Sequence, residues 1–121
     1  MSELMISLQE GRTGFRPGET VGGTVSWSVA GPPASAALTL GWETRGKGDT
    51  DSDIVNKILF DQPRAVDERA FSITLPEGPY SFSGRLISLI WSLELEVGEH
   101  TRRLEIVVSP TGREVELKSV S

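Results

Sequence analysis

Residues 71–97 read FSITLPEGPYSFSGRLISLIWSLELEV, and this stretch decides the fold. From Ile87 to Val97 every second residue is apolar, and serine or glutamate fills most of the positions between. A period of two is typical of a β-strand with one buried face. A second strand, Phe71–Leu75, alternates in the same way and ends before Pro76, because proline cannot donate a hydrogen bond to a neighbouring strand. The stretch therefore predicts two strands of a half-buried sheet.

The same alternation recurs on both sides of this stretch. Segments rich in glycine and proline separate the alternating runs, as turns between strands require. The predicted strands are Leu4–Leu8, Thr20–Val29, Leu38–Trp42, Leu104–Val108 and a short last strand over Val115–Leu117.

Two segments lack a regular period. In Ile54–Phe60 the apolar residues fall on both parities, which predicts an edge strand or a strand with a bulge. Asp61–Arg69 is polar around Pro63 and is predicted to be a connection rather than a strand.

Together these elements predict an all-β fold, an antiparallel β-sandwich of seven to eight strands. A chain of 121 residues suits one domain with one hydrophobic core. We expect a single domain over residues 1–121, with its core at about 3–108 and a last strand or tail at 109–121.

The aromatic residues are expected to form the core of this sandwich. Trp27, Trp42 and Trp91 all occupy the apolar parity of their strands, and Phe71 and Phe82 are assigned to the core with them. The alternative for the tryptophans is a stacking platform for sugars or bases.

Composition excludes several classes of function. The chain has no cysteine, which removes disulfides, thiol catalysis, iron–sulfur clusters and the usual zinc fingers. The net charge is −5 and the largest basic cluster is the pair Arg102 and Arg103, so we expect no nucleic-acid partner. No secretory signal and no apolar run of about twenty residues is present, and a soluble, cytoplasmic protein is expected.

Two motifs resemble the arrestin-like superfamily, which includes arrestins, α-arrestins, the arrestin-like subunit of retromer and bacterial sporulation-control proteins. FRPGETVGGTVSW (Phe15–Trp27) is similar to the arrestin-type opening, a Pro-Gly-Glu turn followed by a strand that carries a glycine. LPEGPYSFSGRLISLIWSLELEV (Leu75–Val97) resembles the second arrestin signature: Ser81, Phe82, Gly84 and Ser88 match, Leu89 stands for isoleucine and Trp91 for tyrosine.

The resemblance implies an immunoglobulin-like sandwich that serves as an adaptor, binds a protein partner through loops or sheet edges and catalyses nothing. Two features depart from the family. Typical members carry two sandwiches, whereas this chain has one. Arrestins that sense receptor phosphates have paired lysines where this chain has Gln9 and Glu10, so phosphate sensing is not expected.

An acidic loop is the one candidate metal site. Asp49, Asp51 and Asp53 have the spacing of the first half of an EF-hand loop. Ile54 stands where that loop needs glycine, and Phe60 where it needs a bidentate glutamate, so a solvated acidic loop without metal is the expected state. A calcium- or carbohydrate-binding module centred on Asp49–Asp53 is the alternative function.

Catalytic constellations are not apparent. His100 is the only histidine, and serines such as Ser81 and Ser83 in a turn usually bond the backbone. Glu94 and Glu96 lie on the outward parity, without a sign of burial that would raise a pKa. We expect neither an enzyme nor a cofactor.

Three outward apolar residues are candidates for contact with a partner. Leu86, Ile90 and Val107 have the solvent parity of their strands and could form a patch for a protein partner or for self-association. The alternative is scattered surface apolar residues, which are normal. A structural homodimer is the third functional hypothesis.

Overall fold

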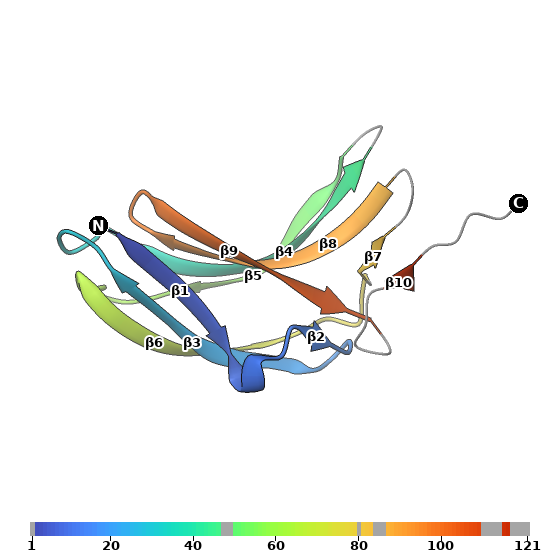
Figure 1. The fold of residues 1–121 in the computed structure, drawn as a ribbon, viewed down its shortest axis with the longest axis horizontal. Helices are drawn as coiled ribbons and strands as arrows, with labels where there is room; N and C mark the ends of the chain where they lie inside the picture. The colour runs from blue at the N-terminus through green and yellow to red at the C-terminus, as the bar shows by residue number, and fades with distance from the viewer. Residues whose placement is uncertain (1, 47–49, 80, 84–86, 110–114, 117–121) are drawn as a thin grey trace, which may run out of the picture.

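The computed structural model describes residues 2–46, 50–79, 81–83, 87–109 and 115–116 of the chain. Two β-sheets stack face to face, which confirms the predicted all-β antiparallel sandwich (Figure 1). None of the segments within these ranges forms a helix long and apolar enough to cross a membrane.

Seven strands of six or more residues build the two sheets within the described ranges. The first sheet has the order β1-β3-β6, and the second has the order β5-β4-β8-β9. The bounds are β1 Glu3–Leu8, β3 Thr20–Ser28, β4 Ala36–Gly46, β5 Ser52–Leu59, β6 Val66–Thr74, β8 Ile87–Val97 and β9 His100–Val108.

Short elements connect and border these strands. Each has two or three residues. They are the 3₁₀ turn η1 Gln9–Gly11, β2 Gly14–Phe15, β7 Phe82–Ser83 and β10 Val115–Glu116. β10 falls on the predicted last strand Val115–Leu117, of which Leu117 lies outside the described residues, and the others are too short for a hydrophobic period to be visible in the sequence.

The core lies between the sheets and is centred on β8. Alternate residues of this strand, from Leu89 to Val97, are buried, as the period of two predicts. Leu38 and Leu40 of β4 and Val21 and Val25 of β3 meet them from the neighbouring strand and from the opposite sheet. Apolar burial of this kind is the main stabilising contribution to a domain of this size.

Strand β9 pairs with two strands of the larger sheet. It forms the predicted hairpin with β8, from Val97 paired with His100 to Trp91 paired with Ile106. Beyond that point it leaves β8, and its last residues, Val107 and Val108, pair in parallel with β2 (Figure 1). One strand therefore hydrogen bonds to β8 over most of its length and to β2 at its end.

Strand β5 is an edge strand with a bulge, as predicted. Among the described strands it pairs only with β4. Its register slips between Leu40, which pairs with Asn56, and Gly41, which pairs with Ile54. Val55 is the extra residue, and an extra residue in one strand reverses the side-chain alternation beyond it.

The prediction for Asp61–Arg69 is wrong in its second half, because β6 begins at Val66. The first inward position of β6 holds a buried carboxylate, Asp67, rather than an apolar residue. Strand patterns are recognised by inward apolar residues, so this polar start resembled a loop.

The glycine in the arrestin-type opening has a steric role. A Cβ atom added to Gly23 in β3 would lie 2.1 Å from the backbone oxygen of Ser7 in β1. Real Cβ atoms do not approach oxygen this closely, so β1 and β3 can keep their spacing only with glycine at this position.

We therefore expect the substitution Gly23→Ala to lower the free energy of unfolding by about 1–3 kcal/mol, because backbone must move to admit the methyl group. Urea denaturation followed by tryptophan fluorescence measures this loss. Gly31→Ala is the matched control, since an added Cβ there meets no atom within 4 Å. Equal stability of the two variants would contradict the steric explanation.

Candidate interaction surfaces

The tryptophans expected in the core differ in their burial. Trp27 and Trp91 are buried, and their indole N–H groups donate to the backbone oxygens of Arg64 (2.7 Å) and Pro79 (2.8 Å). Trp42 is partly buried, lies opposite Trp91 in the register and packs against the core. The rings of Trp27 and Trp91 are therefore enclosed and not exposed for stacking.

Of the two phenylalanines assigned to the core, Phe71 is buried. Phe82 belongs to β7, but its side chain lies outside the described part of the structure.

Two of the three outward apolar candidates lie in one surface hollow. Ile90 and Val107 are partly buried and line a space of about 270 Å³ at the point where β9 leaves β8. Ser88 and Glu105 lie beside them. Leu86 is outside the described residues, so the predicted patch is placed only in part.

Ser81, at the edge of the same hollow, is a backbone hydrogen-bonder. Its side chain is buried, its Oγ accepts a hydrogen bond from the Val108 N–H (3.0 Å), and its own N–H donates to the Val108 oxygen (2.7 Å). His100 is exposed and its Nε2 lies 3.0 Å from Ser2 Oγ. These contacts anchor the two ends of β9.

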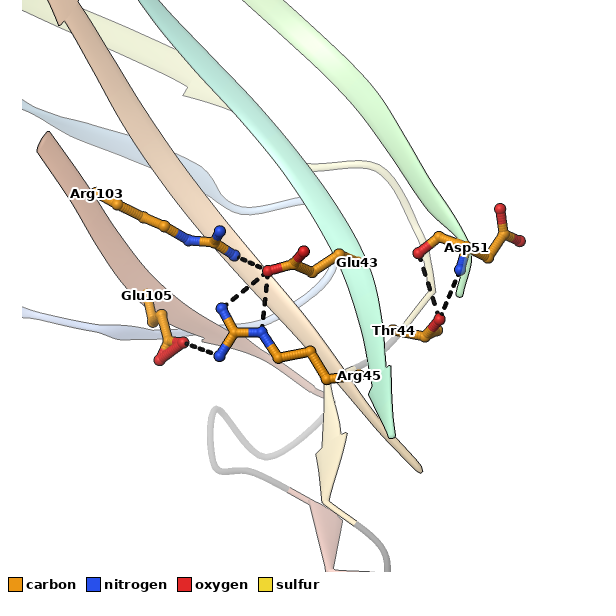
Figure 2. Close-up of polar contacts among 6 residues, drawn as sticks. All are labelled: Glu43, Thr44, Arg45, Asp51, Arg103 and Glu105. Atoms are coloured by element: carbon orange, nitrogen blue, oxygen red, sulfur yellow. Dashed lines mark hydrogen bonds and ion pairs between the residues drawn. The ribbon is translucent and has the colours of Figure 1, made fainter. Parts of the chain in front are cut away.

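The acidic loop is described only in part, since Asp49 lies outside the described residues. Asp51 and Asp53 are exposed. One carboxylate oxygen of Asp51 accepts the Ser52 N–H (2.9 Å), and the Asp51 backbone N–H donates to Thr44 Oγ1 (2.8 Å) (Figure 2). Within the described ranges no three His, Cys, Asp or Glu residues could together hold a metal ion. The calcium- or carbohydrate-binding module stays an alternative hypothesis.

A second hollow, of about 280 Å³, follows β4 on the outer face of the larger sheet. We name it the β4 trough. Its floor consists of small residues of β4, one wall comes from β5, the other wall comes from β8, and a charged group closes one end. The floor is Thr39 and Gly41 with Trp42 beside them, the β5 wall is Ser52, Asp53, Ile54 and Lys57, the β8 wall is Ser92, Glu94 and Glu96, and the end is Glu43 and Arg103.

The bulge in β5 determines which apolar residues line this trough. Ile54 pairs with Gly41 and Leu59 with Ala37, and both partners have outward parity in β4. Five residues separate Ile54 from Leu59, so a regular strand would place them on opposite faces. The extra Val55 brings both to the outer face, where they are 67% and 70% exposed. Leu59 thereby lies on the same face as Ile54, beyond the residues that line the trough.

An ion-pair network closes the end of the trough (Figure 2). Glu43 of β4 accepts hydrogen bonds from Arg45 (2.8 Å) and from Arg103 of β9, and Arg45 also pairs with Glu105 (3.2 Å). Hydrogen bonds from Arg45 and then Arg103 lower the pKa of Glu43. Arg103 is therefore already engaged by a carboxylate.

The expectation of no burial at Glu94 and Glu96 is wrong for Glu94. Burial raises the pKa of the Glu94 carboxyl, and the neighbouring Glu96 raises it further. The cause is position: β8 lies inside its sheet between β4 and β9, so flanking side chains displace water from Glu94. Among the described residues neither glutamate forms an ion pair.

A raised pKa means that ionised Glu94 destabilises the fold at neutral pH, and that this cost disappears as the pH falls through the raised pKa. We expect Glu94→Gln to raise the midpoint of thermal unfolding at neutral pH by about 1–3 °C. Differential scanning calorimetry measures it, with Glu68→Gln on the other sheet as the control. A lower midpoint for Glu94→Gln would contradict this account.

Asp67 is a buried charged residue that the sequence analysis did not identify. Its carboxylate accepts hydrogen bonds from Arg69 (2.9 Å) and from the backbone N–H groups of Arg64 (3.1 Å) and Glu68 (2.8 Å). The hydrogen bond from Arg69 is the largest cause that lowers the pKa of Asp67 to about 2. Its role is structural, because it ties the connection before β6 to the strand.

A lowered pKa in the folded state stabilises the protein above the unfolded value of 3.8 and ceases to do so as the pH falls toward about 2. We expect Asp67→Asn to reduce the free energy of unfolding by about 1–2 kcal/mol at neutral pH. The difference from wild type should shrink between about pH 4 and pH 2.

Urea titrations at a series of pH values measure this difference. Asp61→Asn, an exposed carboxylate of the same connection, is the control. A difference that stays constant over this pH range would show that Asp67 does not act through its charge.

Comparison with solved structures identifies proteins that share the fold of this chain, whereas sequence comparisons find no match. No family model matches the chain, and no curated protein sequence matches it. Among solved structures the chain is similar to Spo0M, the sporulation control protein from Bacillus subtilis, with a TM-score of 0.62 and 19% identity over 89% of this chain and 49% of that one. The chain thus spans about half the length of Spo0M. This likeness confirms the arrestin-like fold.

A β-glucosidase from Listeria innocua also matches, with a TM-score of 0.47 and 14% identity over 95% of this chain. The match covers only 16% of the glucosidase chain. A similarity this low carries no argument about activity.

Proposed function

We propose that this chain is a non-enzymatic interaction module of arrestin-like type, which binds a protein partner through its loops or a sheet edge. The observation that carries the proposal is the likeness to Spo0M, a sporulation control protein, over 89% of the chain. Control of a cellular process by a β-sandwich of this kind requires contact with other macromolecules. We place this function in the cytoplasm, a reducing compartment that a chain without cysteine fits.

The buried polar side chains of the sandwich form hydrogen bonds that hold its own backbone segments together. Asp67 and Ser81 bind backbone groups of neighbouring segments, and the indoles of Trp27 and Trp91 bind backbone oxygens. Across the described residues, no buried side-chain nitrogen or oxygen lacks a hydrogen-bond partner. The surfaces left for recognition are the outer sheet faces, the loops and the edges.

The β5 edge is one such surface. In the described part of the fold its backbone pairs on one side only, with β4. A partner segment that adds to an edge strand gains main-chain hydrogen bonds, and the side chains beside it supply specificity. The exposed Ile54 and Leu59 are those side chains at this edge.

Capture followed by direct measurement tests the proposal. The full chain, tagged and immobilised, is incubated with lysate of the source organism, and bound proteins are identified by mass spectrometry. Each candidate is then purified and titrated against the chain by calorimetry. We expect at least one candidate to bind with a Kd of about 10 µM or tighter.

A heat-denatured sample of the same tagged chain serves as the control for non-specific capture. If no purified candidate binds more tightly than about 1 mM, the adaptor proposal is wrong.

A further inference from the structure

We infer that the β4 trough is a docking surface for an extended segment of a partner protein, in which aliphatic side chains face the β5 wall and lysine or arginine side chains face the β8 wall. This inference rests on the proposed function, because it assumes a protein partner. It adds where the partner binds and what chemistry its binding segment has.

The shape of the trough suits an extended chain. The lining follows β4 from Thr39 to Glu43, and at about 3.3 Å per residue this gives a length of about 13 Å. Threonine and glycine leave the floor low, whereas longer side chains stand on the flanking strands. A segment lying in it points successive side chains toward opposite walls, since residues of an extended chain alternate.

The β5 wall determines one half of the partner's pattern. Ile54 and Leu59 are two large aliphatic side chains exposed to solvent on one face of one strand. Covering them removes apolar surface from water at roughly 25 cal/mol per Å². Lys57 lies between their positions in the register, opposite Thr39. A partner residue that faces this wall is therefore aliphatic, and a basic residue there would be repelled by Lys57.

The β8 wall determines the other half. Glu94 and Glu96 both point outward, and in the described structure neither has a cationic partner. The nearest cation in the register, Arg103 opposite Glu94, is held by Glu43. Burial raises the pKa of Glu94, and the hydrogen bond and charge of Glu96 raise it further, so a cation placed between the two carboxylates would relieve an existing cost.

A second copy of this chain is a poorer occupant than a basic partner. The chain carries a net charge of −5, so two copies repel each other at long range. Antiparallel pairing of two β5 edges that placed Ile54 opposite Leu59 of the second copy would also place the two Lys57 side chains opposite each other, given the bulge at Val55.

Fluorescence anisotropy with a labelled model peptide tests the inference. The probe is a capped nonapeptide in which lysine and leucine alternate, titrated with the full chain at low ionic strength. Two further peptides replace either every lysine by glutamate or every leucine by serine. We expect the lysine–leucine peptide to bind, and each replacement to weaken binding by about tenfold or more.

Variants of the protein locate the binding. We expect Glu94→Gln/Glu96→Gln and Ile54→Ser/Leu59→Ser each to weaken binding of the lysine–leucine peptide by about tenfold. The matched controls remove the same groups from the outer face of the other sheet. Glu3→Gln/Glu68→Gln removes two exposed carboxylates, and Met5→Ser/Val66→Ser removes two exposed apolar side chains. We expect each control to change affinity by less than about twofold.

Any one of three results would overturn the inference. The first is no binding of the lysine–leucine peptide by the wild-type chain at concentrations up to about 1 mM. The second is an equal loss in the Glu94→Gln/Glu96→Gln variant and in its control, which would show non-specific attraction to negative charge. The third concerns self-association. Light scattering of the wild type at the same concentrations tests whether a second copy of the chain occupies the trough. A doubled mass that is lost in the Ile54→Ser/Leu59→Ser variant would overturn the inference in favour of a second copy.

The experiments distinguish failure of the trough inference from failure of the proposed adaptor function. If a purified partner from the capture experiment binds wild type and Glu94→Gln/Glu96→Gln equally, the trough is not its site and the adaptor function stands. If no partner binds while the peptide does, the trough recognises its ligand chemistry but the adaptor proposal is wrong.

Discussion

The structure depends on the burial of one face of β8. Trp91, Leu93, Leu95 and Val97 are fully buried, and the strand is hydrogen bonded to β4 along one edge and to β9 and β7 along the other. The apolar area of these side chains outweighs any single polar contact in the molecule. Because successive side chains of a strand point to opposite faces, the same constraint fixes Glu94 and Glu96 on the outside. The acidic wall of the β4 trough is thus a geometric result of how the core is built.

Local alternation was sufficient to predict the layers of this fold. The buried face of β8, its hairpin with β9 and the irregular edge strand β5 all follow from the period of the sequence. The start of β6 did not, because Asp67 and Arg69 occupy positions that an apolar residue usually fills. Their compatibility with the interior depends on backbone groups of the connection before the strand, and the sequence gives no sign of that tertiary contact.

The candidate surface could be predicted only in pieces. Parity assigned Ile90 and Val107 to the outside, and the structure places both in one hollow. Parity also placed Glu94 and Glu96 correctly, but it could not show burial, which depends on the neighbours in the sheet. The apolar wall was beyond sequence analysis, since the sequence does not show where the bulge falls. Only the slip at Val55 puts Ile54 and Leu59 on the same side.

β5 is an outermost strand of the larger sheet, and β6 is an outermost strand of the smaller sheet. Both affect how copies of the chain can associate. β6 carries two inward-pointing charged side chains at its start, and β5 carries a bulge and a lysine. These are devices by which β-proteins prevent unpaired strands from stacking with copies of themselves. At these two edges the bulge, the lysine and the inward charges therefore oppose pairing between copies of the chain in concentrated solution.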